Sequence, residues 1–223
     1  MKLATIVGAR PQFIKAAPVC NAMVNNGVNE FLIDTGQHYD DEMAGSFFRE
    51  LNLPNPKYSL NIGSGTHASM TGKMLQGIEG VLMKELPDMV LVYGDTNTTL
   101  AGSLAAAKLH IPVAHIEAGL RSFRSTMPEE INRKLTDHCS SILFCPTRQA
   151  IKQLKNEGLA DNNVNEEIIT LSDSFQAKQR NKPLALNVGD VMVDALFNMQ
   201  ERFKKKTPEI KLPDSDYVLF TLH

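Results

Sequence analysis

Short apolar runs alternate with longer amphipathic stretches along most of the chain. Runs of strand length lie at Leu3–Val7, Phe31–Ile33, Val90–Tyr93, Val113–Ile116 and Ile142–Cys145. A segment whose apolar residues recur with helical spacing follows each of them. Because strands that alternate with helices form parallel sheets, the pattern predicts an α/β fold, a Rossmann-like doubly wound parallel sheet.

The expected helices begin at residues that favour helix starts. Pro11 stands where the first helix should begin, Thr96 can cap a helix that runs to His110, and Pro128 precedes the acidic first turn of another. The small residues from Ala101 to Ala107 would let the second of these helices lie close to the sheet.

Two segments depart from this alternation. Residues from about 161 to 182 are polar and poorly periodic, which predicts a surface insertion. After a helix from Val191 to about Lys205, two prolines mark a linker, and Tyr217–Leu222 is typical of a buried strand. We therefore expect one domain over residues 1–206, followed over 207–223 by a linker and the first strand of a C-terminal lobe that the sequence does not complete.

Composition and charge narrow the class of protein. The chain has 223 residues, 43% of them hydrophobic, and a formal net charge of −2. This balance argues against nucleic acid or an anionic membrane as the main partner. The three cysteines form no CxxC pair, no apolar run reaches membrane-spanning length, and the chain turns at Gly8 too early for a signal peptide. We expect a cytoplasmic protein.

Carboxylates follow the predicted strands or begin a helix in three motifs. Asp95 follows the strand Val90–Tyr93, Glu117 follows the strand Val113–Ile116, and Glu129 follows Pro128. Since loops after successive parallel strands gather at the carboxyl edge of a sheet, the three side chains are expected to share one rim.

Each carboxylate also has a purely structural interpretation. Asp95 could cap a helix, although Thr96 and its neighbour could do so equally well. Glu117 alternates with His115, so the two are expected on one strand face, and Arg121 is a candidate ion-pair partner for Glu117. The helix dipole alone could explain Glu129 and the glutamate after it, and Arg133, a turn further on, could hold these carboxylates or contact a ligand.

Basic residues flank the turn between the first strand and its helix. Arg10 and Lys15 lie beside backbone N–H groups at a helix start, which is the arrangement of a phosphate or diphosphate site. The alternative is that both are solvated surface charges. The turn is neither a GxGxxG nor a Walker motif, and no His, Cys or Asp spacing is typical of a metal site. We therefore expect no cofactor and no metal, and His223 could be a general acid or a phosphate ligand.

The motifs together resemble one family. In chain order they are Gly8–Lys15, Thr35–His38, Gly94–Thr96, His115–Arg121, Pro128–Arg133 and Val188–Asp194. They resemble the non-hydrolysing UDP-N-acetylglucosamine 2-epimerase family. The resemblance implies the N-terminal lobe of a two-lobe architecture like that of GT-B glycosyltransferases, with an active site between the lobes. It also implies a homodimer.

The family's roles carry over by position. The resemblance implies that Asp95, Glu117 and Glu129 are the acid/base carboxylates and that Arg10 and Lys15 contact the UDP-sugar substrate. His223 would lie near the diphosphate in a catalytic role, and Arg133 would help to bind substrate. The implied reaction removes the C2 proton, eliminates UDP to give a 2-acetamidoglucal, and adds UDP back with C2 inverted, supplying precursors for surface polysaccharides.

Other functions remain open at this point. The Gly8–Phe13 turn, Gln37–Asp40 and Asn61–Thr66 resemble the branch that acts on modified sugars such as UDP-2,3-diacetamido-glucuronate. A GT-B glycosyltransferase or a hydrolysing epimerase would use a similar fold. The remaining hypothesis is that the 223-residue chain by itself is an inactive binding module.

Overall fold

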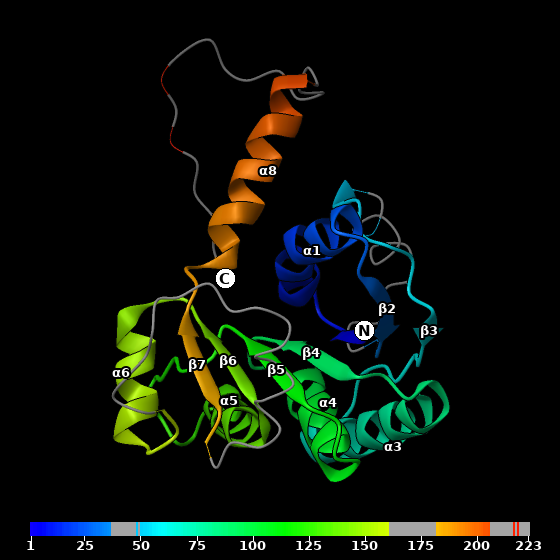
Figure 1. Ribbon diagram of the computed structural model, residues 1–223, viewed down its shortest axis with the longest axis vertical. Helices are drawn as coiled ribbons and strands as arrows, with labels where there is room; N and C mark the ends of the chain where they lie inside the picture. The colour runs from blue at the N-terminus through cyan, green and yellow to red at the C-terminus, as the bar shows by residue number, and fades with distance from the viewer. Residues whose placement is uncertain (37–47, 49, 161–181, 206–215, 217, 219–223) are drawn as a thin grey trace.

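The structure is a computed structural model that describes residues 1–36, 48, 50–160, 182–205, 216 and 218 (Figure 1). The predicted insertion at 161–182 lies outside the described residues except for Lys182. Of the predicted strand Tyr217–Leu222, only Val218 is described. His223 also lies outside the described residues.

Within the described residues, parallel strands form one seven-stranded sheet in the order β3-β2-β1-β4-β5-β6-β7. The strands are β1 (Lys2–Val7), β2 (Asn29–Asp34), β3 (Tyr58–Ser59), β4 (Met89–Tyr93), β5 (Val113–Ile116), β6 (Ile142–Cys145) and β7 (Leu184–Asn187). All the strands predicted for the described residues are confirmed. The edge strands β3 and β7 were not predicted, because they are short and carry no strong apolar run.

Helices cover both faces of the sheet, as Figure 1 shows. One face carries α1 (Arg10–Asn25) and α8 (Val191–Lys205), and the other carries α3 (His67–Glu85), α4 (Asn97–Lys108), α5 (Pro128–Cys139) and α6 (Arg148–Asn156). Leu3, Val7 and Tyr93 belong to the core under α1, whereas Ile6 and Val92 belong to the core under α3 and α4. Because both faces are covered, the central strands are mostly apolar, with Thr5 and His115 as buried polar exceptions.

Helix α4 lies close to the sheet, as its small residues predicted. A Cβ atom added to Gly102 would stand 3.0 Å from Cδ1 of Ile6 and 3.1 Å from Cγ1 of Val92. Thr96 is the N-cap residue of α4, and its hydroxyl accepts a hydrogen bond from the backbone N–H of Thr99 at 3.3 Å. The cap prediction is confirmed, so Asp95 is not needed to cap this helix.

The strand order reverses direction between β1 and β4. The chain leaves β1 for α1 on one face and leaves β4 for α4 on the other, so the two loops diverge at the carboxyl edge. Ligands of open α/β sheets bind in the crevice at such a point. The turn at Gly8–Ala9 and the turn at Gly94–Asp95 both lie there.

Among the described helices, none combines the length and the apolar character that a membrane span requires.

Candidate active site

Lys15 and Glu117 form an ion pair at the carboxyl edge of the sheet, although 102 positions separate them. Their side chains are 13% and 20% exposed, so solvent reaches both. A Cβ atom added to Gly94 would stand 3.2 Å from Oε2 of Glu117 and 3.3 Å from Nζ of Lys15. The pair therefore lies against the turn that carries Asp95, and it joins α1 to the ends of β4 and β5.

Arg121 is not the partner of Glu117. Its guanidinium contacts Asp137 at 2.7 Å and Glu157 at 2.6 Å instead. The alternative in which Arg121 neutralises Glu117 is therefore wrong, because the chain turns sharply between the two residues and α1 supplies a nearer cation.

Glu117 has a left-handed backbone conformation, with φ of 76°. The N–H groups of Glu117 and Ala118 both donate to the carbonyl oxygen of Phe144, at 3.1 and 3.0 Å. Left-handed φ in a residue other than glycine costs about 1–3 kcal/mol, and such residues cluster at functional sites. The turn directs Glu117 towards α1, whereas His115 contacts α5 on the other side of the sheet. The expectation that they share a face was therefore wrong.

Arg133 of α5 links Asp95 to Glu130. Its Nη2 pairs with Oδ2 of Asp95, and its Nη1 lies 2.8 Å from Oε2 of Glu130. The side-chain amide of Asn132 donates to the backbone oxygen of Asp95 at 3.0 Å. Of the two glutamates that Arg133 was considered to hold, the structure pairs it with Glu130, and the contact with Asp95 was not foreseen.

The two adjacent glutamates of α5 have different environments. Glu130 is only 1% exposed and accepts hydrogen bonds from the N–H and hydroxyl of Ser122, at 2.9 and 3.1 Å. Burial opposes its charge, but these hydrogen bonds, that of the Phe123 N–H and the nearby Arg133 outweigh it and lower the pKa of Glu130 to about 2. Glu129 is exposed on the same helical turn. Of the two, Glu129 is free to meet a ligand.

Replacing Glu130 with glutamine is expected to lower the free energy of unfolding at pH 7 by about 2–3 kcal/mol. Because the fold lowers the pKa of Glu130 from 4.5 to about 2, its contribution is complete above pH 4.5 and is lost as the pH falls towards 2. Urea unfolding between pH 3 and pH 7 measures this, and the gap between wild type and variant should narrow at low pH. Glu129→Gln is the matched control and should change stability by less than about 0.5 kcal/mol. A gap that does not vary with pH would contradict the assignment.

A buried glutamine fixes the start of α1. The side chain of Gln12 donates to the carbonyl oxygen of Tyr93 at 3.1 Å and to the hydroxyl of Thr99 at 3.0 Å, and it accepts from the N–H of Ala9 at 3.1 Å. It thereby ties the turn after β1 to the end of β4. Sequence reasoning assigned Gln12 no role, although a polar residue on the buried side of a first helical turn was a usable signal. Arg10 is exposed as the first residue of α1.

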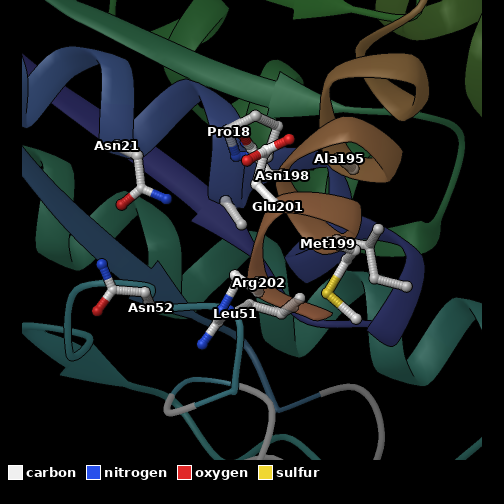
Figure 2. A pocket seen from close by; sticks show the side chains of 11 residues that line it. Pro18, Asn21, Leu51, Asn52, Ala195, Asn198, Met199, Glu201 and Arg202 are labelled. Atoms are coloured by element: carbon white, nitrogen blue, oxygen red, sulfur yellow. The ribbon is translucent and has the colours of Figure 1, made fainter. Parts of the chain in front are cut away.

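Two pockets open beside α1. One, of about 280 Å³, is lined by Glu117, Asp190 and Asp194 together with apolar side chains such as Phe144. The other, of about 410 Å³, lies between α1 and α8, and none of the predicted site residues that the structure describes lines it (Figure 2). The smaller pocket therefore adjoins the candidate site, and the larger one is separate from it.

The sequence profile of a known family covers most of the chain. The profile is described as UDP-N-acetylglucosamine 2-epimerase, and it matches residues 21–223. The chain belongs to the UDP-N-acetylglucosamine 2-epimerase family.

Relatives within this epimerase family match all or nearly all of the chain. A UDP-2,3-diacetamido-2,3-dideoxy-D-glucuronate 2-epimerase from Pseudomonas aeruginosa is 52% identical over 226 residues, which are 100% of this chain and 57% of the relative. The crystal structure of UDP-GlcNAc 2-epimerase from Methanocaldococcus jannaschii, in complex with UDP-GlcNAc and UDP, is 49% identical. It superimposes with a TM-score of 0.81 over 93% of this chain and 51% of that one. The chain thus spans a little over half the length of these epimerases.

The fold is shared more widely than the epimerase family. MurG from Acinetobacter baumannii is 16% identical and superimposes with a TM-score of 0.50 over 67% of this chain and 42% of its own. At this identity the likeness concerns the fold alone. The Rossmann-like lobe that the resemblance implied is confirmed for this epimerase-family chain.

Proposed function

We propose that this chain carries the acid/base residues of a UDP-sugar 2-epimerase, which inverts C2 of a UDP-2-acetamido sugar. The observation that supports it best is the Lys15 and Glu117 ion pair against the Gly94–Asp95 turn. It sets a cation and two carboxylates at the point of the sheet where ligands of this fold class bind. Residues 1–206 would form the first lobe, and residues 207–223 would begin the second.

The proposed chemistry needs a base, an acid and cations. The C2 proton is weakly acidic, so a carboxylate must remove it on one face and a second group must deliver a proton on the other. Asp95, Glu117 and Glu129 are the candidates for these proton transfers. When Glu117 takes up a proton, its charge no longer balances Lys15, and the ammonium group becomes available to the departing diphosphate.

Other residues would bind the substrate. Arg10, exposed at the start of α1, would contact phosphate oxygens beside the helix N-terminus. Arg133 would keep Asp95 in place through the ion pair already formed. His223 would complete the phosphate site as a catalytic residue. We expect no metal or other cofactor to take part.

The identity of the sugar has two candidates. UDP-N-acetylglucosamine is supported by the M. jannaschii structure, whose description names that ligand. A 2,3-diacetamido-glucuronate derivative is supported by the P. aeruginosa relative. Assays with both UDP-sugars, followed by separation of the C2 epimers, decide between them.

The proposal includes a homodimer and a location in the cytoplasm, where a polysaccharide precursor would be made. Cys20, Cys139 and Cys145 are all free thiols, as a reducing compartment would leave them. Size-exclusion chromatography with light scattering tests the dimer.

Epimerisation in D2O is the decisive experiment. A protein of the relatives' length that contains this chain should convert the UDP-sugar to its C2 epimer, with one deuterium at C2 of each product molecule. Epimer formed without deuterium would rule out the proton-transfer mechanism. Free N-acetylmannosamine would indicate a hydrolysing enzyme, and a need for an acceptor would indicate a glycosyltransferase.

The chain by itself should turn over little substrate, because one lobe cannot enclose the sugar and exclude water. Calorimetry with UDP and UDP-N-acetylglucosamine tests whether it still binds either. Rapid epimerisation by the 223-residue chain would contradict this expectation.

A further inference from the structure

A buried polar network connects the two turns that carry Asp95 and Glu117. Its centre is His115, which is completely buried. Nδ1 of His115 lies 2.7 Å from Oδ1 of Asp137, and Nε2 lies 2.7 Å from the carbonyl oxygen of Gly94. Both ring nitrogens therefore face an oxygen, and the imidazole bridges α5 to the residue directly before Asp95.

The carboxylate of Asp137 holds the other turn. Its Oδ2 accepts a hydrogen bond from the N–H of Gly119 at 3.2 Å and lies 2.7 Å from Nη1 of Arg121. Asp137 is completely buried, and the charge of Arg121 is shared with Glu157. A single side chain on α5 thus fixes the residue two places after Glu117 and, through His115, the residue one place before Asp95.

A contribution to folding stability does not explain why His115, Asp137 and Arg121 are buried together. Removing charged groups from water opposes folding, and buried ionic clusters can often be replaced by apolar side chains without loss of stability. Such a cluster fixes the orientation of its partners, because each hydrogen bond holds the group that it reaches in one direction. Here the groups so oriented are backbone atoms of Gly94 and Gly119, beside the proposed proton-transfer residues.

We propose that His115 and Asp137 are positioning residues that hold the Gly94–Asp95 turn and the Glu117–Gly119 turn in a fixed geometry relative to each other. The importance of this geometry for catalysis rests on the proposed function. The link between the turns does not, so the two can be tested separately.

Hydrogen exchange tests the link. In Asp137→Asn, which keeps the size of the side chain and removes its charge, NMR should show amide exchange at Gly94 and Gly119 at least tenfold faster than in wild type. Glu157→Gln is the matched control, because it removes the outer partner of Arg121 and leaves the contacts of Asp137 with His115 and Gly119 in place. Its exchange at both turns should stay within twofold of wild type. Unchanged exchange in Asp137→Asn would overturn the proposal.

Kinetics test the catalytic consequence in a protein of the relatives' length. Asp137→Asn should lower kcat per folded molecule at least tenfold and leave KM within about threefold, because a displacement near 1 Å can cost about 100-fold in rate. Glu157→Gln should keep kcat within twofold. If Asp137→Asn speeds exchange but keeps the wild-type kcat, the network is structural only and the positioning role is overturned.

A second variant tests the same link between the turns in case Asp137→Asn does not fold. If Asp137→Asn does not fold, His115→Gln interrupts the same link between Asp137 and Gly94, and exchange at Gly94 should again rise at least tenfold. Wild-type protein without epimerase activity would contradict the proposed function, while the exchange data would still support or overturn the link between the turns.

Discussion

Glu117→Gln is expected to lower kcat for epimerisation by about 100- to 10,000-fold, the range that general acid–base catalysis contributes. The substitution keeps the size of the side chain and its ability to accept a hydrogen bond from Lys15, but it removes the group that can take up a proton. Exchange of the C2 proton with D2O should fall by the same factor, because Glu117 is proposed to take part in that transfer.

The fold should tolerate this substitution. The Lys15 and Glu117 side chains are only 13% and 20% exposed, so replacing their ion pair with a neutral hydrogen bond is expected to cost about 1–3 kcal/mol, less than the stability of a typical domain. Circular dichroism and thermal unfolding should therefore show a folded variant. A lower kcat in this folded variant would then reflect the loss of proton transfer by Glu117.

Glu85→Gln is the matched control for this experiment. Glu85 also pairs with lysines, Lys2 at 2.7 Å and Lys57 at 2.8 Å, but it ends α3 beside the first residues of β1, away from the candidate site. Its kcat should stay within about twofold of wild type, because Glu85 pairs with Lys2 at the start of β1, at the edge of the sheet opposite the candidate site. If Glu117→Gln keeps more than about a tenth of the wild-type kcat, Glu117 is not an acid/base residue and its contact with Lys15 is structural.

Gly119→Ala should lower the free energy of unfolding by about 2–5 kcal/mol, from strain and overlap together. Gly119 has φ of 78°, which an L-residue adopts at a cost of about 1–2 kcal/mol. An added Cβ would also stand 2.7 Å from the carbonyl oxygen of Ala150, a backbone atom of α6 that cannot rotate away. Urea unfolding of the chain itself measures the effect.

Gly158→Ala separates the two causes. Gly158 has φ of 76°, but an added Cβ would meet nothing within 4 Å. Its loss of stability should be limited to about 1–2 kcal/mol of backbone strain. Equal losses in both variants would show that the approach of Gly119 to α6 is unimportant, and the close packing of this turn would then have to be reconsidered.

Local patterns predicted much of the fold. An apolar strand followed by an amphipathic helix is visible within a few residues, so β1, β2, β4, β5 and β6 were located correctly. The N-cap at Thr96 and the start of α5 at Pro128 follow from local chemistry as well. The strands β3 and β7 were missed because their short segments are recognisable only by their pairing with β2 and β6.

Contacts between residues that are distant in the sequence were not predicted. Asp95, Glu117 and Glu129 were expected at one rim because they follow strands or begin a helix, yet their contacts could not be derived from that. Arg133 pairs with Asp95 across 38 positions. Glu130 is buried and Glu129, the residue before it, is exposed. No local sequence pattern distinguishes the two.

The amino-acid pattern was enough to predict the α/β class, the places of the central strands, and the carboxylates and cations worth testing, because periodicity and turn chemistry act over a few residues. The folded structure was needed to show that Lys15 reaches Glu117, that Glu117 turns away from His115 and that Asp137 joins two turns. Those contacts depend on how α1 and α5 pack on opposite faces of one sheet. Packing of that kind is set by the whole core, so no short segment of sequence specifies it.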